Sequence, residues 1–281
     1  MARFDAVIVP ARPLKMIGNI AKRLPGAGSV AVTSGRRKEN NVYGHIYYNI
    51  ARPDPDLLKT FNDVSTATLS DAMGRHGAIS SEIRPIYENI RMVGSALTVL
   101  CFPGDNVMTH KALQMIQPGD VLVVDDGDYN TGCFGHKSAL HARSRGGVGI
   151  VASGSVRDVA LLRRDRFPTF ARGVSPRAPQ KNTPGSINVP VHIGGIVIHP
   201  GDIVVGDDDG VVVVPLAMAN EVIERAKLRD RKEQEAADSA PGELPLDPAG
   251  RVLQLDEILK GKVTEHRERV SWSARSPSAP D

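Results

Sequence analysis

The sequence predicts an α/β domain in which at least some of the strands are parallel. Between residues 94 and 174, strand-like and helix-like patterns alternate through two full cycles. Turn signals rich in glycine, proline and aspartate separate these segments. A third observation is a repeated turn motif. Pro118-Gly119-Asp120 and Pro200-Gly201-Asp202 each lead into a short apolar strand pattern.

The first elements divide an N-terminal extension from the domain. Residues 1–55 are rich in Pro, Gly, Arg and Asn, and contain only a strand-like run at 6–9 and a short helical pattern at 16–24. The pattern of apolar and polar residues changes near Pro55, and we expect the α/β domain to cover residues 56–236. Its first helices are predicted at 56–64 and 67–77. Ser65 or Thr66 would cap the second, and Gly74 or Gly77 would end it.

The alternating segments follow in order. The predicted strands are 94–102, 120–126, 146–153 and 168–174; the predicted helices are 106–116, 135–145 and one entered through a turn within 155–164. Asp209-Gly210 between two valine-rich runs predicts a β-hairpin. A helix over 217–236 closes the domain, and residues 237–281 are expected to form a linker, a short helix at 252–261 and a tail.

Composition excludes several classes of protein. The 35 basic and 32 acidic side chains leave a formal net charge of +3, so the charge alone predicts no nucleic-acid partner. The apolar run at 7–9 is too short for a signal segment or a membrane span, which predicts a cytoplasmic protein without a membrane partner. Cys101 and Cys133 lack CxxC spacing and are interpreted as reduced core residues.

The first candidate site is Arg157-Asp158, which follows a predicted buried strand and a glycine-rich turn. Active sites of α/β folds gather at the carboxyl ends of strands. The guanidinium of Arg157 could hold a carboxylate in a bidentate manner, and Asp158 could offer oxygen to Mg²⁺. The alternative is an ordinary helix cap with a surface salt bridge.

The second candidate is the start of the helix predicted at 135–145. The backbone N–H groups of His136, Lys137 and Ser138, after Gly135, would lack intrahelical acceptors and could bind an anion. The alternative is a helix start with no ligand. Arg157 follows His136 by 21 residues, which is about the length of a helix and a strand that bring the chain back beside its starting point.

Other polar positions are interpreted more simply. The acidic clusters at 125–128 and 207–209 lack the spacing of a calcium loop and are assigned to turns. Asp105 or Asn106 could cap the next helix while facing the same cleft, and His110 is interpreted as a packed or partly exposed histidine.

Together these motifs resemble the superfamily of the 4-hydroxy-4-methyl-2-oxoglutarate/4-carboxy-4-hydroxy-2-oxoadipate aldolases and the regulator of ribonuclease activity A. The matching stretches lie at 65–74, 94–106, 118–127, 135–158 and 190–215. The resemblance implies a swivelling, phosphohistidine-domain-like α/β sandwich that assembles into homotrimers or hexamers. It also implies a Mg²⁺ or Mn²⁺ cofactor and a small 2-oxo acid substrate.

The resemblance also assigns roles to individual residues. Arg157 would bind the pyruvyl carboxylate, Asp158 would hold the metal directly or through water, and the amides of Gly135, His136, Lys137 and Ser138 would cradle the substrate. His136 stands where the aldolases carry an acidic residue, and it could accept a proton or ligate through nitrogen, which makes it a candidate catalytic residue beside Arg157. Ser153 likewise stands where relatives often have Asp.

The leading functional hypothesis is a metal-dependent lyase. It would cleave a 4-hydroxy-2-oxo acid to pyruvate, decarboxylate oxaloacetate, or do both, because each reaction passes through the enolate of pyruvate. The alternative is a non-catalytic protein-binding regulator that resembles the regulator of ribonuclease activity A. A methyltransferase is the least favoured reading, since no glycine-rich nucleoside loop follows the first strand.

Overall fold

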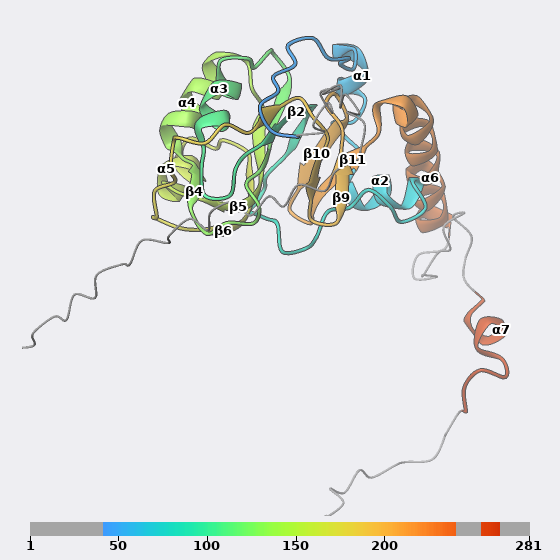
Figure 1. The fold of residues 1–281 in the computed structure, drawn as a ribbon. Coiled ribbons are helices and arrows are strands. Elements are labelled where there is room, and N and C mark those ends of the chain that lie inside the picture. The colour runs from blue at the N-terminus through green and yellow to red at the C-terminus, as the bar shows by residue number, and fades with distance from the viewer. Residues whose placement is uncertain (1–41, 240–253, 265–281) are drawn as a thin grey trace, which may run out of the picture. The chain divides into compact units, whose positions relative to one another are not determined.

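A mixed nine-stranded sheet organises the computed structural model, which describes residues 42–239 and 254–264 (Figure 1). Its main path runs β1–β6–β5–β3–β2–β10–β11, with β4 beside β5 and β7 beside β2. These strands are β1 (Arg84–Pro85), β2 (Met92–Leu100), β3 (Asp120–Asp125), β4 (Gly132–Phe134), β5 (Gly149–Val156), β6 (Thr169–Val174), β7 (Ser186–Ile187), β10 (Ile203–Asp207) and β11 (Gly210–Val214). A separate pair is β8 (Val191–Ile193) and β9 (Ile196–Ile198). The strand expected at 6–9 and the helix expected at 16–24 lie outside the described residues.

Strand direction divides the sheet at β2. On one side β2, β3, β5 and β6 are parallel neighbours, and β4 is parallel to β5. On the other side β10 is antiparallel to β2, and β11 is antiparallel to β10. Of these strands, β2, β3 and β5 are almost completely buried, as expected for strands covered on both faces. The predicted hairpin at Asp209-Gly210 is confirmed, since it joins β10 to β11.

The sheet curves until its two edges almost meet. At the β11 edge, the N–H of Val213 donates to the carbonyl of Gly77, and the N–H of Ile79 donates to the carbonyl of Val211. A few residues later the same segment forms β1, which pairs with β6 at the opposite edge. Residues 77–85 therefore connect the edges, and the sheet is nearly a closed barrel.

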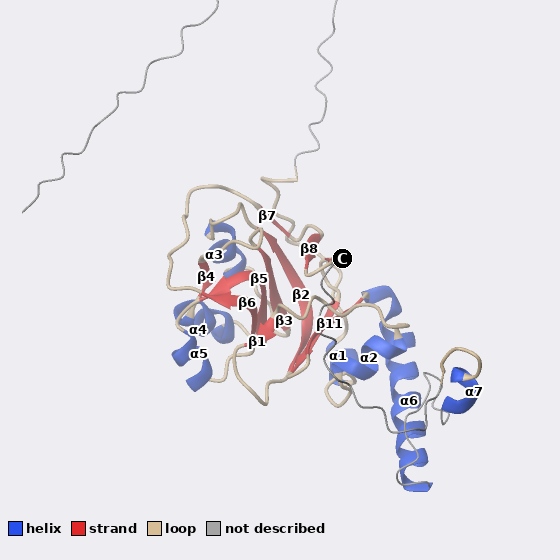
Figure 2. Ribbon diagram, turned by 90° about the horizontal axis from the view of Figure 1, so that it is seen from below, coloured by secondary structure: helices blue, strands red, loops and turns tan. Residues whose placement is uncertain are grey.

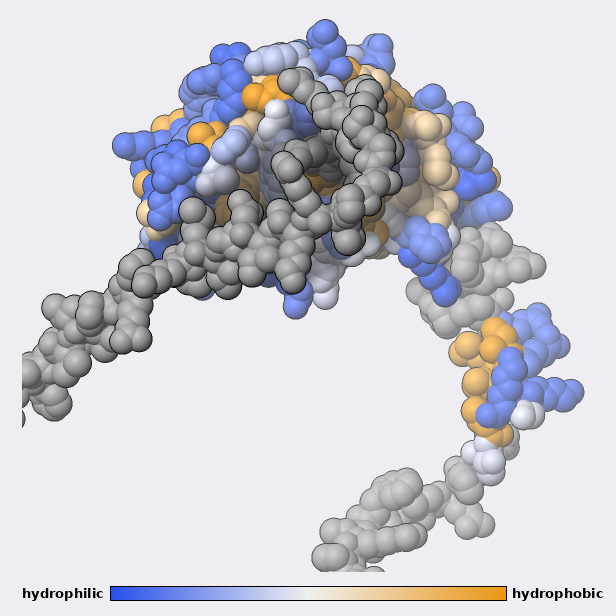
Figure 3. All heavy atoms as spheres, viewed as in Figure 1, coloured by the Kyte–Doolittle hydropathy of each residue, from blue (hydrophilic) through white to orange (hydrophobic). Residues whose placement is uncertain are grey.

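Helices cover the outside of this sheet in two groups (Figure 2). The first group covers the parallel half and consists of α3 (Val107–Leu113), α4 (His136–Ser144) and α5 (Val159–Arg164). The second covers the β10–β11 hairpin and includes α1 (Pro55–Lys59), α2 (Thr66–Ala72) and α6 (Ala219–Ser239). A 3₁₀ turn, Leu216–Met218, precedes α6, and α7 is Leu255–Leu259. Hydrophilic side chains cover the outward face of α6 (Figure 3).

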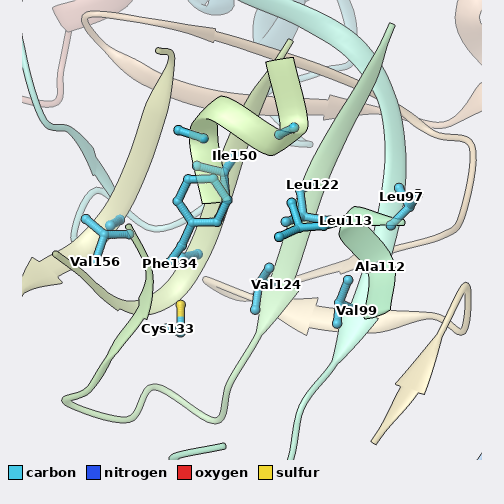
Figure 4. Close-up of a cluster of buried hydrophobic side chains, with 14 of the residues drawn as sticks. Leu97, Val99, Ala112, Leu113, Leu122, Val124, Cys133, Phe134, Ile150 and Val156 are labelled. Carbon is cyan, nitrogen blue, oxygen red and sulfur yellow. The ribbon is translucent and has the colours of Figure 1, made fainter. Parts of the chain in front are cut away.

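Alternation along the strands sorts the core into layers. On β2 and β3, Leu97, Val99, Leu122 and Val124 face the α3–α4 layer, where they pack with Phe134 and other side chains (Figure 4). The intervening positions of these strands face a second cluster inside the curved sheet. On β10 and β11 the outward positions pack against α2 and α6 instead. The alternation of side chains with a period of two is the expected geometry of a strand. The mixed sheet and the helices packed on it confirm the predicted α/β fold.

Several boundaries differ from the prediction. The helix expected at 56–64 ends at Lys59, while Ser65 caps α2 as expected by accepting a hydrogen bond from the Thr68 N–H. The strand expected at 146–153 runs from Gly149 to Val156, because β4 supplies a pairing partner for its last residues. Ser155 and Val156, which were expected in a turn, therefore lie in β5. The short strands β1, β4, β7, β8 and β9 were not predicted.

The first described residues are bound to the domain. The N–H of Gly44 donates to the carbonyl of Gly185, and Ile46 forms a bridge with Ile187. The guanidinium of Arg52 makes two hydrogen bonds, of 2.9 and 3.1 Å, to the fully buried carboxylate of Asp120. Part of the predicted N-terminal extension therefore contributes to the stability of the α/β domain.

Two further expectations concern the chain as a whole. Cys101 and Cys133 are both free and buried, which confirms that they are reduced core residues. In the described part of the chain, no helix has the length and apolar character needed to cross a membrane.

Candidate functional site

The pairing of β4 with β5 brings the two candidate motifs together. These strands are parallel, with Gly132 beside Ser155 and Phe134 beside Val156, so they end at the same level. Gly135 and His136 follow β4, and Arg157 and Asp158 follow β5. The N–H of Arg157 donates to the carbonyl of Phe134 at 2.9 Å. The 21-residue spacing in the sequence is therefore the length of α4, its connection and β5.

Asp158 has an unusual backbone conformation that orients its side chain. It lies in the left-handed region at φ 58° and ψ 32°, which is uncommon for a residue other than glycine, although aspartate tolerates it better than most. Asp158 precedes α5, but its carboxylate does not cap that helix. Oδ2 instead accepts a hydrogen bond of 3.1 Å from the N–H of His136, the first residue of α4. The expected helix-cap alternative is therefore wrong for the Asp158 side chain.

The salt bridge between Arg157 and Asp158, the other part of that alternative, is weak. Arg157 Nε lies 4.0 Å from Asp158 Oδ2, and both side chains are about two-fifths exposed. An ion pair with this separation and exposure contributes little. The guanidinium of Arg157 is thus available to an anion in solution.

Two glycines allow these segments to approach closely. A Cβ on Gly135 would lie 2.6 Å from Asp158 Oδ2, and a Cβ on Gly132 would lie 2.8 Å from the Cβ of Arg157. Neither glycine has a positive φ, so steric contact and not backbone conformation requires glycine here. The absence of a side chain at 132 and 135 lets Arg157 and Asp158 lie against β4 and the start of α4.

His136 does not occupy the place that its expected catalytic role requires. Its Nε2 forms a 2.6 Å hydrogen bond with Asp165 Oδ2, beyond the end of α5. Arg164 and His136 together hold the pKa of Asp165 far below its usual range. The residues that line the neighbouring cavity do not include His136. The geometry therefore assigns the His136 backbone N–H to the site and its imidazole to the contact between α4 and α5.

A cavity of about 440 Å³ opens where these segments meet. It lies at the carboxyl ends of β2, β4 and β5, the usual position of ligand sites in α/β folds. Its lining contains the candidates Gly135, Lys137, Ser138, Arg157 and Asp158. It also contains Asn106, one of the two residues expected to face this cleft. The other lining residues were not predicted as part of the site: His110, Gly132, Phe134, Ala178, Pro179 and Lys181.

Asn106 lines this cavity and has one unsatisfied acceptor. Its Nδ2 donates to the carbonyl of Cys133 at 3.0 Å, which fixes the orientation of the amide. Its Oδ1 is buried, and within the described residues it has no hydrogen-bond partner. An unpaired buried acceptor is energetically costly, so this amide is an exception among the buried polar groups.

The remaining wall is a loop fixed by Asp105. The buried carboxylate of Asp105 accepts hydrogen bonds of 2.7 and 2.8 Å from the N–H groups of Asn182 and Thr183, and one from Val107 N–H. Three backbone hydrogen bonds to one carboxylate lower the pKa of Asp105 despite the opposing effect of its burial. The backbone of Gln180 also bonds to Gly104 and Asn106. Lys181 is thereby held at the cavity.

His110 lies near two cationic side chains. Burial lowers its pKa, and the positive charges of Lys181 and Arg157 lower it further. A lowered pKa favours the neutral imidazole at neutral pH, which can accept a proton. The expectation of a partly exposed histidine is confirmed, and His110 also lines the cavity.

A second buried acid lies beside β4 and outside the cavity lining. Ser153 donates a 2.8 Å hydrogen bond to Asp126, and burial raises the pKa of Asp126 to about 6 despite hydrogen bonds from Ser153 and Cys133. Burial also raises the pKa of the Cys133 thiol well above its usual range. Ser153, the position where relatives often carry Asp, thus donates to one oxygen of a buried carboxyl group at the end of β3.

The donor set fits a hydrated divalent cation better than a protein-enclosed one. No cluster of three His, Cys, Asp or Glu side chains suited to a metal occurs among the residues that the structure describes. Among the residues of the described ranges, Asp158 is the only acidic side chain in the cavity lining. Mg²⁺ commonly binds through one or two carboxylates, several waters and the substrate itself, so Asp158 fits this type of ion and does not fit a zinc site.

The site residues that sequence reasoning missed come from a distant segment. Ala178, Pro179 and Lys181 follow β6 and show no motif of their own. Their link to the site is the carboxylate of Asp105, 77 positions before Asn182. The signal available in the sequence was only a buried-looking acid after a strand, which also fits a helix cap.

Comparisons with known proteins agree with the fold and the motifs. The family described as RraA-like, Aldolase/RraA, matches residues 66–213. A protein of Halalkalibacterium halodurans named "Putative 4-hydroxy-4-methyl-2-oxoglutarate aldolase" is 36% identical over 186 residues, which covers 66% of this chain and 89% of the relative.

Two solved structures of proteins named RraA are also similar to this chain. One is Streptomyces coelicolor RraAS2, described as an unusual member of the RNase ES inhibitor RraA protein family. It aligns with a TM-score of 0.62 and 32% identity, over 67% of this chain and 100% of its own. The RNA-processing inhibitor RraA from Thermus thermophilis aligns with a TM-score of 0.51 and 29% identity over 54% of this chain and 93% of its own. The predicted resemblance is confirmed, and this chain belongs to the RraA-like (Aldolase/RraA) family.

Proposed function

We propose that this protein is a divalent-metal-dependent lyase that cleaves a 4-hydroxy-2-oxo acid to pyruvate, with oxaloacetate decarboxylation as a related activity. The observation that carries the proposal is the convergence of Arg157, Asp158 and the start of α4 on one cavity. The name of the Halalkalibacterium relative supports the aldolase reaction.

The residues present could bind the pyruvyl half of the substrate. The guanidinium of Arg157, which has only a weak contact with Asp158, would hold the C1 carboxylate. The first N–H groups of a helix lack intrahelical acceptors; that of His136 donates to Asp158, and Lys137 and Ser138 line the cavity. Their N–H groups, together with the positive end of the α4 dipole, favour an anionic group.

Asp158 is the proposed metal ligand. Its Oδ2 is oriented by the His136 N–H, which leaves the other oxygen for a hydrated Mg²⁺ or Mn²⁺. When bound, the cation would supply electrostatic stabilisation for negative charge on the C2 oxygen.

His110 is the proposed general base. Neutral His110 would take the proton from the C4 hydroxyl, the C3–C4 bond would break, and its electron pair would form the enolate of pyruvate while an aldehyde or ketone leaves. Return of a proton to C3 then gives pyruvate. His136, with its imidazole bound to Asp165, has no part in this sequence beyond its backbone N–H.

A direct test measures pyruvate release. Purified protein would be incubated with 4-hydroxy-2-oxoglutarate and with oxaloacetate, with Mg²⁺, with Mn²⁺ and after chelation. We expect metal-dependent turnover that Arg157→Gln abolishes. If neither substrate yields pyruvate above the uncatalysed rate, the lyase proposal is wrong.

The second candidate is a protein-binding regulator. It is favoured by the names of the two RraA proteins, which describe inhibitors, and by His136 standing where the aldolases carry an acid. A regulator would slow RNA cleavage by a partner ribonuclease, and this effect would survive Arg157→Gln. The expected homotrimer or hexamer belongs to both candidates and is tested by light scattering of the purified protein.

A further inference from the structure

We propose that this protein binds single-stranded nucleic acid on an aromatic surface beside α3, outside the candidate active site. This aromatic surface consists of Tyr43, His45, Tyr47, Tyr48, Phe102 and Tyr129, with Lys111 and Arg177 beside it. None of these residues lines the cavity that contains Arg157 and Asp158. The inference therefore does not depend on the lyase proposal, and it adds a second class of ligand.

The first argument is the exposure of aromatic rings. Four Phe and Tyr side chains of the described residues are exposed: Tyr48 by 58%, Tyr47 by 52%, Phe102 by 46% and Tyr129 by 41%. All four belong to the aromatic surface, and the other Phe and Tyr side chains of the described ranges are buried or half-buried. Aromatic rings are usually buried because this stabilises the fold, so several exposed rings in one place indicate a binding surface.

The segment before α1 fixes the orientation of two rings. Ile46 forms a bridge with Ile187 on β7 and packs against the core. Side chains alternate along an extended chain, so the two neighbours of Ile46, His45 and Tyr47, point outward and are exposed. Their rings are nearly parallel, at 19°, and the ring centroids lie 6.1 Å apart. Rings held in one orientation by the backbone are suited to stacking with successive bases.

The loop after β2 extends the aromatic surface. The centroid of the Tyr43 ring lies 6.3 Å from that of Phe102, which follows β2. Tyr129 lies against Gly104 in the same loop, since a Cβ on Gly104 would be 2.8 Å from the Tyr129 ring. The rings therefore reach from the segment before α1 to the loop between β3 and β4. A single strand offers the flat faces of its bases to such rings, whereas a duplex keeps them stacked inside.

Two cations lie over rings of the aromatic surface. Lys111 Nζ is 5.8 Å from the centre of the Tyr48 ring, and the guanidinium carbon of Arg177 is 6.0 Å from the centre of the Tyr129 ring. A nucleotide whose base stacks on one of these rings, or on a neighbouring ring, carries a phosphate that such a cation can bind. Rings and cations thus occur together, as nucleic-acid binding requires.

The distribution of charge also favours a polyanion, although the net charge of +3 alone does not. No acidic residue occurs at 40–53 or at 166–201, the stretches that contain Tyr43 to Tyr48 and Arg177. Asp128, next to Tyr129, is paired with Arg172 at 3.1 Å. Residues 1–41, which precede the aromatic segment, contain eight basic side chains and two acidic ones. Basic stretches attract phosphates from solution, and the exposed rings then supply the stacking contacts.

The test measures the binding of fluorescein-labelled probes of about 12 nucleotides to the full chain by fluorescence anisotropy. The probes are a single-stranded RNA, the DNA of the same sequence, and the RNA duplex. We expect the single strands to bind at least about fivefold tighter than the duplex, and the ratio of RNA to DNA affinity identifies the preferred ligand. Tyr47→Ala and Phe102→Ala should each weaken single-strand binding about 5- to 100-fold.

Two controls separate stacking from a general loss of structure. Tyr47→Phe keeps the ring and should bind within about twofold of wild type. Leu228→Ala, on α6, removes a side chain that is 47% exposed and should leave binding unchanged. Arg177→Gln should reduce the slope of log affinity against log salt concentration by about 0.7, because one phosphate contact is lost.

Three results would overturn the inference. The first is no single-strand binding by the wild-type protein. The second is an equal loss of affinity for inorganic polyphosphate in Tyr47→Ala, because polyphosphate has no bases and the site would then be purely electrostatic. The third is a smaller oligomer in light scattering of Tyr47→Ala and Phe102→Ala, with nucleic-acid affinity unchanged, which would assign the aromatic surface to a contact between subunits.

Discussion

The carboxylate of Asp158 accepts a hydrogen bond from the backbone N–H of His136, 22 residues earlier in the chain. This contact replaces the capping of α5 that an aspartate at this position ordinarily provides. It joins the end of β5 to the start of α4, so one acidic side chain both occupies a helix N-terminus and faces the cavity.

Replacing Arg157 should remove recognition of the C1 carboxylate. Arg157→Lys keeps the charge but loses the planar fork of donors, and we expect kcat/KM for pyruvate release to fall at least about 100-fold. Arg225→Lys, on the exposed surface of α6, is the control and should retain full activity. Activity within threefold of wild type in Arg157→Lys would show that a point charge is sufficient.

Replacing His136 should have little effect on catalysis. Because its imidazole binds Asp165 and is absent from the cavity lining, His136→Gln should keep kcat/KM within about threefold of wild type. A modest loss of thermal stability is expected from the weakened α4–α5 contact. Should the rate fall 30-fold or more while the fold is intact, the imidazole takes part in the reaction, as the sequence resemblance suggested.

Adding a methyl group at Gly135 should displace Asp158. The new Cβ would lie 2.6 Å from Oδ2, while the extended backbone at φ −154° accepts alanine without strain. We expect Gly135→Ala to weaken Mg²⁺ binding about tenfold or more and to change the melting temperature by only a few degrees. Calorimetric titration with Mg²⁺ checks the first expectation. Unchanged Mg²⁺ affinity would argue against Asp158 as the metal ligand.

The pH profile should report on His110. A general base acts in its neutral form, which is present above its pKa and is lost as the pH falls through it. Because burial, Lys181 and Arg157 lower the pKa of His110, the acid limb of kcat/KM should lie below pH 6.5. Lys181→Gln removes one of the positive charges and should move this limb to higher pH. Lys137 and Asp158 also line the cavity, so a Lys137→Gln profile serves as a comparison.

Removing Arg52 should destabilise the whole domain. Asp120 is fully buried and would be left without its charged partner, which costs about 3–5 kcal/mol. Arg52→Met should therefore lower the free energy of unfolding by this amount in a urea titration. The double variant Arg52→Met, Asp120→Asn should recover part of the loss, because the uncompensated charge is gone. If Arg52→Met alone is neutral, water must replace the guanidinium.

The parts of this protein that could be predicted from sequence are those governed by local patterns. The alternating segments at 94–174 gave the parallel half of the sheet, and Asp209-Gly210 gave the hairpin, since turn chemistry and apolar periodicity act over a few residues. Gly135 and Arg157 could be paired because the spacing matches one helix and one strand. The position of the His136 ring could not, because it depends on Asp165 at the end of another helix.

The position of Lys181 also could not be predicted from local sequence patterns. Its place at the cavity depends on two backbone hydrogen bonds between Gln180 and residues 104–106, and on the carboxylate of Asp105, which also resembles a helix cap. Such contacts between distant segments leave no local pattern. The short strands β1, β4 and β7 were missed for a related reason, because two or three residues carry too little periodicity to identify a strand.

The reversal of strand direction at β2 has a consequence for the order of folding. β3, its parallel neighbour, follows after a single helix, whereas β10, its antiparallel neighbour, arrives roughly 100 residues later in the chain. During synthesis the parallel half can therefore assemble while one edge of β2 still exposes unpaired N–H and C=O groups. An open edge of this kind can pair with another chain. We expect nascent or truncated chains that end before Ile203 to aggregate.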